Sequence, residues 1–181
     1  NGNFSALNQA IGTTTTITGY TTGDMLYASA ATALSKLAIA GTAQSVLTAG
    51  ATAPAWSVMP AFAAYLSANQ AIANNTDTKV AFDTEEFDPQ AAYDAVTNFR
   101  FTVPAGQGGK YMFGASVGLT SIGDTTILRV TLYKNGVAFR RLFEDTGSTA
   151  FPAIFTGSTL VTAIATDFFE IFALQNNGAQ N

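Results

Sequence analysis

Four carboxylates within six residues form a cluster whose residue types and spacing could do chemistry: Asp83, Glu85, Glu86 and Asp88. Two carboxylates can act as acid and nucleophile in glycoside hydrolysis, and an oxygen-rich loop can bind calcium. The spacing matches no defined calcium motif. We expect one solvated loop between two strands, with calcium binding as the first alternative and catalysis by Glu85 and Glu86 as the second.

Other catalytic chemistry is restricted because the sequence contains no histidine and no cysteine. Without histidine the usual general base is missing and no Ser-His-Asp triad can form. Without cysteine there is no thiol nucleophile, disulfide or thiolate metal site. The glycine-rich segment 106–109 lacks the Lys-Ser/Thr pair of a phosphate-binding loop and predicts a turn between strands. We therefore expect no catalytic residue, no enzymatic activity and no cofactor.

Charge is scarce in this chain. Only 11% of the residues are charged, against about 25% in ordinary soluble domains. The eight lysines and arginines form no run along the sequence, and because phosphate backbones require clustered cations we expect no nucleic-acid partner. No apolar run reaches the roughly 18 residues of a membrane span, so we expect no membrane insertion. A surface this poor in charge indicates that other chains cover much of it.

The composition changes near Pro60. Residues 1–60 hold only two charged side chains and four aromatic ones, too few large side chains for an ordinary core. They predict an extended arm with little regular structure that orders against partner chains; a disordered linker is the alternative. The threonine-rich run 13–18 favours extended backbone. Segment 29–38 predicts a short helix with Ala30, Ala33, Leu34 and Leu37 on one face.

Residues 61–181 read as a series of strands. Apolar residues alternate with others in segments 62–66, 99–103, 111–119 and 128–132, and two more strands are expected near 153–163 and 167–174. Asn135-Gly136 predicts a two-residue type I′ hairpin turn, with Leu132 opposite Phe139. Many short strands separated by turns predict an all-β sandwich, barrel or jelly roll.

The strand expected at 167–174 is apolar on both faces. Phe169, Ile171 and Ala173 share one face, and Phe168, Phe172 and Leu174 share the other, with Glu170 as the polar exception. A sandwich strand in a monomer usually has one apolar face. We expect the outer face to be covered by another copy of the chain, or alternatively by a loop.

Several segments together resemble the globular head of complement component one-q, a tumour-necrosis-factor-like jelly roll. They are FAAYL at 62–66, TKVAFD at 78–83, FRFTVPAG at 99–106, GKYMF at 109–113, LYKNGV at 132–137 and DFFEI at 167–171. The resemblance covers about residues 61–177 and implies a homotrimeric jelly-roll head. The expected trimer-interface residues are Tyr111, Phe113, Phe168, Phe169 and Phe172.

One part of that pattern is missing. The family has a final strand in the inner sheet near the trimer axis, and no such strand follows residue 175 in this sequence. We expect the natural chain to continue beyond residue 181; the alternative is a strand supplied from elsewhere.

The arm resembles the repeat-like segment of tailed-bacteriophage fibre and appendage proteins. The similar segments are GDMLYASA at 23–30, ALSKLAI at 33–39, QSVLT at 44–48 and PAW at 54–56, within residues 20–57. The two resemblances together imply a structural virion protein: a homotrimeric fibre or appendage on the virion surface. Its arm would contact other virion proteins, and its head would bind a host-surface glycan or protein. A bacterial surface or spore-coat trimer and a carbohydrate-active enzyme are the alternatives.

Overall fold

A computed structural model describes residues 19, 21–31, 33–39, 45–50, 52–119, 127–146 and 153–178. The chain divides into two compact units, residues 1–59 and 60–181, and the break falls at the change in composition near Pro60. Regular structure in the described residues consists of strands, which confirms the all-β prediction. In those residues no helix has the length and apolar character to cross a membrane. The threonine-rich run 13–18 lies outside the described residues.

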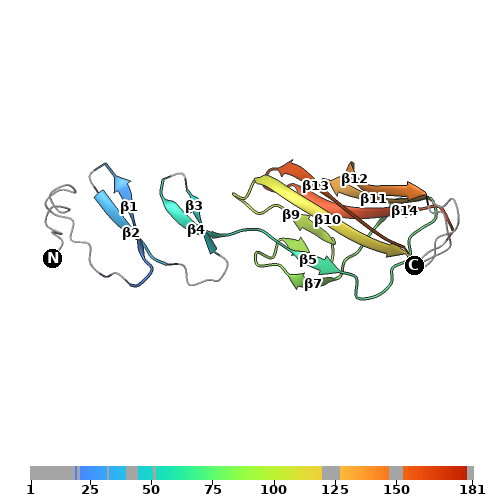
Figure 1. The fold of residues 1–181 in the computed structure, drawn as a ribbon, viewed down its shortest axis with the longest axis horizontal. Helices are drawn as coiled ribbons and strands as arrows, with labels where there is room; N and C mark the ends of the chain where they lie inside the picture. Colours follow the sequence, from blue (N-terminus) through green and yellow to red (C-terminus); the bar gives the residue numbers. More distant parts are fainter. Residues whose placement is uncertain are drawn as a thin grey trace. The chain divides into compact units, whose positions relative to one another are not determined.

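The first unit contains two β-hairpins where little regular structure was expected (Figure 1). β1 (Met25–Ala30) pairs with β2 (Ala33–Leu37), and β3 (Ser45–Ala49) pairs with β4 (Pro54–Val58). The helix predicted for residues 29–38 is therefore wrong. The helical spacing of Ala30, Ala33, Leu34 and Leu37 is only a weak preference, and pairing of residues 33–37 with the residues before the turn overrides it.

The two charges of this unit pair with each other beside the first hairpin. Lys36 lies 3.3 Å from Asp24, which also accepts hydrogen bonds from the backbone N–H groups of Thr21 and Ile39. The indole N–H of Trp56 donates to the carbonyl of Ala38 at 2.8 Å and links the second hairpin to the end of the first. A few directional bonds thus organise a unit that is poor in large side chains.

The second unit is a β-sandwich of two layers (Figure 1). One layer is a six-stranded sheet in the order β12-β11-β14-β9-β8, with β6 also paired to β14. Its strands are β6 (Thr78–Lys79), β8 (Tyr93–Asp94), β9 (Arg100–Thr102), β11 (Ile127–Lys134), β12 (Val137–Thr146) and β14 (Phe168–Gln175). The other layer consists of two pairs, β5 (Ala63–Tyr65) with β7 (Thr84–Phe87) and β10 (Gly109–Leu119) with β13 (Ala153–Ala163). The strands predicted near 62–66, 99–103, 111–119, 128–132, 153–163 and 167–174 are confirmed.

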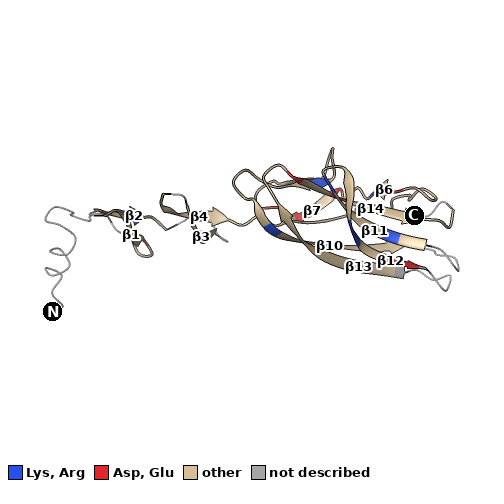
Figure 2. Ribbon diagram, turned by 90° about the horizontal axis from the view of Figure 1, so that it is seen from above, with Lys and Arg blue, Asp and Glu red and all other residues tan. Residues whose placement is uncertain are grey.

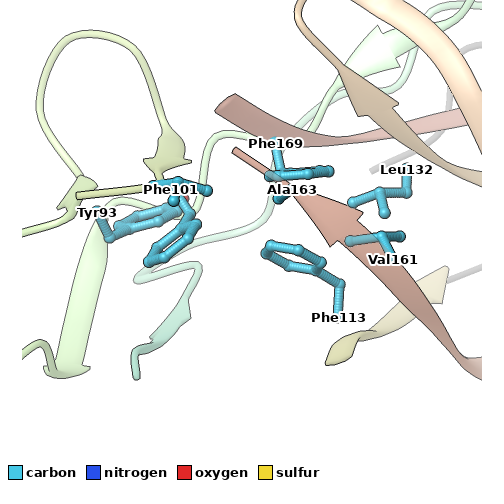
Figure 3. Close-up of a cluster of buried hydrophobic side chains, with 8 residues drawn as sticks. Tyr93, Phe101, Phe113, Leu132, Val161, Ala163 and Phe169 are labelled. Atoms are coloured by element: carbon cyan, nitrogen blue, oxygen red, sulfur yellow. The ribbon is translucent and has the colours of Figure 1, made fainter. Parts of the chain in front are cut away.

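The core lies between these layers, because inward side chains of β10 and β13 pack on those of the six-stranded sheet. Phe101 is 1% exposed and stacks on Phe62 at 4.9 Å between ring centroids. Figure 3 shows Phe113 facing Phe169 near Leu132, and those two rings are 4.3 Å apart. The alternation predicted for residues 111–119 is confirmed, because the odd-numbered positions point inward.

The hairpin between β11 and β12 has the predicted turn but a different register. Asn135 and Gly136 have φ values of 54° and 77°, as a type I′ turn requires. Tyr133 pairs with Ala138, but Leu132 then pairs with Arg140, because a β-bulge adds one residue to β12. The predicted pairing of Leu132 with Phe139 is therefore wrong, and Phe139 stays partly exposed.

Asp167 fastens this hairpin to the end of β13. The buried carboxylate lies 2.7 Å from the Lys134 ammonium and accepts hydrogen bonds from the Asn135 side chain and the Ile164 backbone N–H. Lys134 first, and then these two donors, lower the pKa of Asp167 from 3.8 to about 2. The ionised carboxylate is therefore favoured in the folded state.

The sandwich is expected to become less stable as pH drops from about 4 to 2. Protonation of Asp167 should account for part of this loss of stability. Because the folded state lowers this pKa, the contribution is complete above the unfolded value of 3.8 and is lost as pH falls through about 2. Asp167→Asn should lower the urea midpoint at neutral pH and flatten its decline below pH 4. Glu86→Gln, on the exposed part of β7, is the control and should leave the pH profile unchanged. An Asp167→Asn profile parallel to the parent profile would contradict this assignment.

Candidate functional site

The sequence predicted that the four clustered carboxylates form one loop. This prediction is wrong, because a strand runs through the middle of the cluster. Residues 84–87 are strand β7, in which Glu85 and Glu86 are both exposed and the pairing with β5 is irregular at Glu86. Asp83 accepts hydrogen bonds from the Ser67 backbone N–H and hydroxyl, which hold the pKa of Asp83 below its usual value. Asp88 accepts the Tyr93 backbone N–H at 2.6 Å. Both aspartates therefore organise loops.

The structure offers no geometry for the calcium and glycosidase alternatives at these carboxylates. Among the residues it describes, no three or more acidic side chains are grouped so that they could hold a metal ion. A glycosidase pair must flank one bond from two sides, and Glu85 and Glu86, which are adjacent residues of one short strand, do not provide two opposed positions.

Three of the five expected interface residues belong to the interior of the sandwich. Phe113 and Phe169 are buried against each other in the core. Tyr111 is half-buried beside them, and its hydroxyl donates to the carbonyl of Gln107 at 2.5 Å. For Phe113 and Phe169 the expectation of an intersubunit surface is corrected, because the protomer itself surrounds them; Tyr111 stays partly exposed.

Phe168 and Phe172 do lie on the outer face of β14, but neighbouring side chains partly cover them. The Arg100 guanidinium lies over the ring of Phe168, 4.1 Å from its centroid. Tyr133 stacks on Phe172 with centroids 3.9 Å apart. Aromatic and cationic side chains from adjacent strands therefore shield the second apolar face of this strand. A second copy of the chain is not required to cover it.

The outer face of the β10–β13 pair is a surface that sequence reasoning missed. Met112, Leu160 and Ile154 are 74%, 73% and 78% exposed, and Met112 lies directly opposite Leu160 in the ladder. We call this surface the β10–β13 face; its outward residues are Lys110, Met112, Gly114, Ser116, Gly118, Ile154, Thr156, Ser158, Leu160 and Thr162. Figure 2 shows long stretches without charge along both strands. The sequence did contain a signal for this surface. The even-numbered positions of 110–118, which face outward, include only one charged residue.

A groove opens between β5 and β10, in the same layer. It encloses about 390 Å³ and reaches down to Phe113, Leu132 and Phe169. In the described residues β10 forms ladder hydrogen bonds with β13 and β5 with β7, so each has one edge without a strand partner. On the other side of the sandwich, β13 closely approaches β12: a Cβ on Gly157 would lie 2.2 Å from the carbonyl oxygen of Leu142.

The fold gathers cations that are dispersed in the sequence. Six of the eight lysines and arginines lie in strands of the six-stranded sheet, namely Lys79, Arg100, Arg129, Lys134, Arg140 and Arg141. Three of them line a shallow pocket of about 310 Å³, which we call the arginine pocket; its residues are Asp77, Arg129, Thr131, Ala138, Phe139, Arg140 and Arg141. Up to 64 positions separate these residues in sequence, so no local motif marked the site.

No protein-family model matches the chain, and no curated protein is significantly similar to it in sequence. The surfaces described above, together with the two resemblances, are therefore the basis for a functional proposal.

Proposed function

We propose that this chain is a structural protein of a bacteriophage particle. In this proposal it is a homotrimeric fibre or appendage with an outward-facing, jelly-roll adhesion head formed by residues 60–181. The two sequence resemblances support the phage assignment, and the two-layered β-sandwich is compatible with a jelly roll. The observation on which assembly rests is the β10–β13 face, which exposes apolar side chains and is almost free of charge.

The β10–β13 face has the chemistry of a surface that associates with itself. Burying a side chain of the size of Leu160 or Met112 contributes about 1.5–3 kcal/mol. Between the apolar residues lie Gly114, Ser116 and Ser158, whose small side chains permit a close approach of another backbone. Extended apolar patches on soluble proteins usually mark interaction sites. Copies brought together here meet almost no like charge, so assembly costs little electrostatic energy.

Introducing charge into this face is expected to convert a trimer into monomers. The test is sedimentation velocity of the full chain at micromolar concentration, where the parent should sediment at three times the chain mass of 18.8 kDa. Met112→Lys combined with Leu160→Lys should give the single-chain mass, because six ammonium groups would be brought together in each trimer. Far-UV circular dichroism should stay unchanged.

Val96→Lys is the matched control, since Val96 is also an exposed apolar residue but lies in a turn away from this face. This variant should remain trimeric. A parent chain that is monomeric at micromolar concentration would overturn the trimer. A trimer that survives the double substitution would remove the β10–β13 face as its interface.

A further inference from the structure

We infer that the groove between β5 and β10 accepts one extended, uncharged strand from another polypeptide. The strand would pair with both edges of the groove and join β5 and β10 into one continuous sheet. This second interaction surface depends on neither the phage assignment nor the trimer proposed above. The direction of the two edges, their lack of charge and the shape of the groove support it.

The two edges of the groove can pair with one and the same strand. Residues of β5 and β10 line the groove and residues of β7 and β13 do not, so the edges without a strand partner in the described residues face it. Figure 1 shows the arrows of β5 and β10 pointing the same way. A strand that runs in the opposite direction is therefore antiparallel to both, and backbone N–H and C=O groups can form a ladder on each side.

The edges that border the groove lack the charges that usually protect a free strand edge. Natural proteins discourage pairing with other chains by placing charged side chains along edge strands. β12, the edge of the six-stranded sheet, follows this rule with two arginines and two acidic residues between positions 140 and 145. β5 has no charged residue, and segment 112–116 of β10 has none either. These two edges are therefore suited to accept a strand.

The groove leaves part of the core surface open. Ala115 points inward between Phe113 and Val117, yet it stays partly exposed while both of these neighbours are buried. Ala64 of β5 also packs against the core and is partly exposed. An inward side chain of an added strand would cover these two small residues. Covering them favours binding, because apolar surface is removed from water.

The rim of the groove selects the chemistry of the strand. Tyr65 on β5 and Met112 on β10 line it and are 52% and 74% exposed. Gly114 has no side chain, so the backbone of β10 is accessible beside it. Among the described residues that line the groove, the one charged side chain is Glu170, which is already paired with Lys79. The groove therefore favours a strand without charge and with apolar side chains on its inward face.

The test measures binding of three synthetic peptides to the full chain by isothermal titration calorimetry. The strand probe is KTVTVTVTK, which has valines on one face, threonines on the other and terminal lysines for solubility. The control peptides KTPTPTPTK and KTDTDTDTK carry proline or aspartate at the valine positions. We expect saturable binding of the strand probe, at one peptide per chain, and no binding of the controls. Proline cannot pair within a sheet, and an unpaired carboxylate is costly to bury.

Hydrogen–deuterium exchange locates the bound peptide. With the strand probe at about ten times its Kd, the backbone amides of 63–65 and 112–116 that face the groove should exchange about tenfold more slowly. The amides of residues 140–145, on the charged edge of β12, are the internal control and should keep their exchange rates. Protection of β12 in place of the groove, or binding of the proline peptide as tightly as the strand probe, would overturn the inference.

Ala64→Phe places a large side chain in the groove and should weaken binding of the strand probe roughly tenfold or more. Ala105→Phe is the matched control, because Ala105 lies in an exposed turn and does not line the groove. This variant should bind like the parent. Urea midpoints establish whether the variants are folded, and the peptide controls on the parent chain decide the matter if Ala64→Phe does not fold. Equal affinity of both folded variants would contradict the assignment.

The outcome for the groove can be distinguished from the outcome for the assembly. Ala64 packs against the core and is not on the β10–β13 face, so Ala64→Phe should leave the sedimentation coefficient unchanged. A lower mass would show that a second copy of the chain occupies the groove, which would overturn a separate partner. A monomeric chain that binds the strand probe would refute the trimer and support the groove. A trimer that does not bind the probe would refute the groove and support the assembly.

Discussion

Phe101→Ala is expected to lower the free energy of unfolding of the sandwich by about 3–5 kcal/mol, the usual range for truncating a buried phenylalanine. Its ring is 1% exposed and lies 4.9 Å from Phe62 and 5.7 Å from both Tyr111 and Phe113. The Phe101 ring is the central member of an aromatic cluster that packs the two layers together, so its removal leaves a cavity between them. β9 is only three residues long, so little backbone pairing remains to hold the vacated position.

The measurement is urea unfolding followed by near-ultraviolet circular dichroism, at fixed protein concentration because assembly would shift the midpoint. Phe87→Ala is the control, since Phe87 is half exposed on β7 and should cost less than about 1 kcal/mol. Equal losses in the two variants would show that the Phe101 cluster does not hold the layers together.

Lys79→Met is expected to destabilise the sandwich by about 3 kcal/mol, because it leaves a buried carboxylate without its cation. The Glu170 side chain is 5% exposed, and its carboxylate lies 2.5 Å from the Lys79 ammonium. Lys79 also donates to the carbonyl of Asn98 at 3.2 Å. Since the Lys79 side chain is 34% exposed, solvent screens part of the attraction and places the loss at the lower end of the range for buried pairs.

Glu170→Gln added to Lys79→Met should restore part of the lost stability, because a neutral amide is cheaper to bury than an unpaired carboxylate. A double-mutant cycle of urea midpoints isolates the interaction between the two side chains. The double variant should be more stable than Lys79→Met alone. A double variant that is no more stable would mean that Glu170 finds another partner or becomes solvated.

Strands were predictable wherever residues alternate strictly between apolar and other types. In β10, the odd positions from Tyr111 to Leu119 could be assigned to the core from their spacing alone. The Asn135-Gly136 turn was predictable because it needs two residues with positive φ. Both features depend on residues close together in the sequence.

The errors arose where pairing decided the outcome. Residues 29–38 could form a helix by their spacing, but the segment contains the end of β1, a turn and β2, and the pairing of β2 with β1 determines the structure. The bulge at Phe139 changes a register that a regular hairpin would have given. Phe113 and Phe169 were recognised as apolar, but whether a protomer or a partner surrounds such a residue depends on how the layers pack.

The candidate surfaces depend on topology still more. Asp77 precedes β6, Arg129 lies in β11 and Arg140 in β12, so the arginine pocket exists only once these segments are assembled. The cations looked dispersed because sequence order does not follow sheet order. The β10–β13 face could have been found by examining the outward positions of the predicted strand for missing charge.

β14 has a consequence for biosynthesis, because it follows the other described strands in sequence yet lies in the middle of its sheet. β11 pairs with one of its edges, and β9 and β6 pair with the other. As the chain leaves the ribosome, these three strands emerge before the strand that joins them. Until residues 168–175 appear, their edges lack a partner and are open to pairing with other nascent chains. The six-stranded sheet therefore cannot close until residues 168–175 have been synthesised, and its unpaired strand edges are most exposed to aggregation before that point.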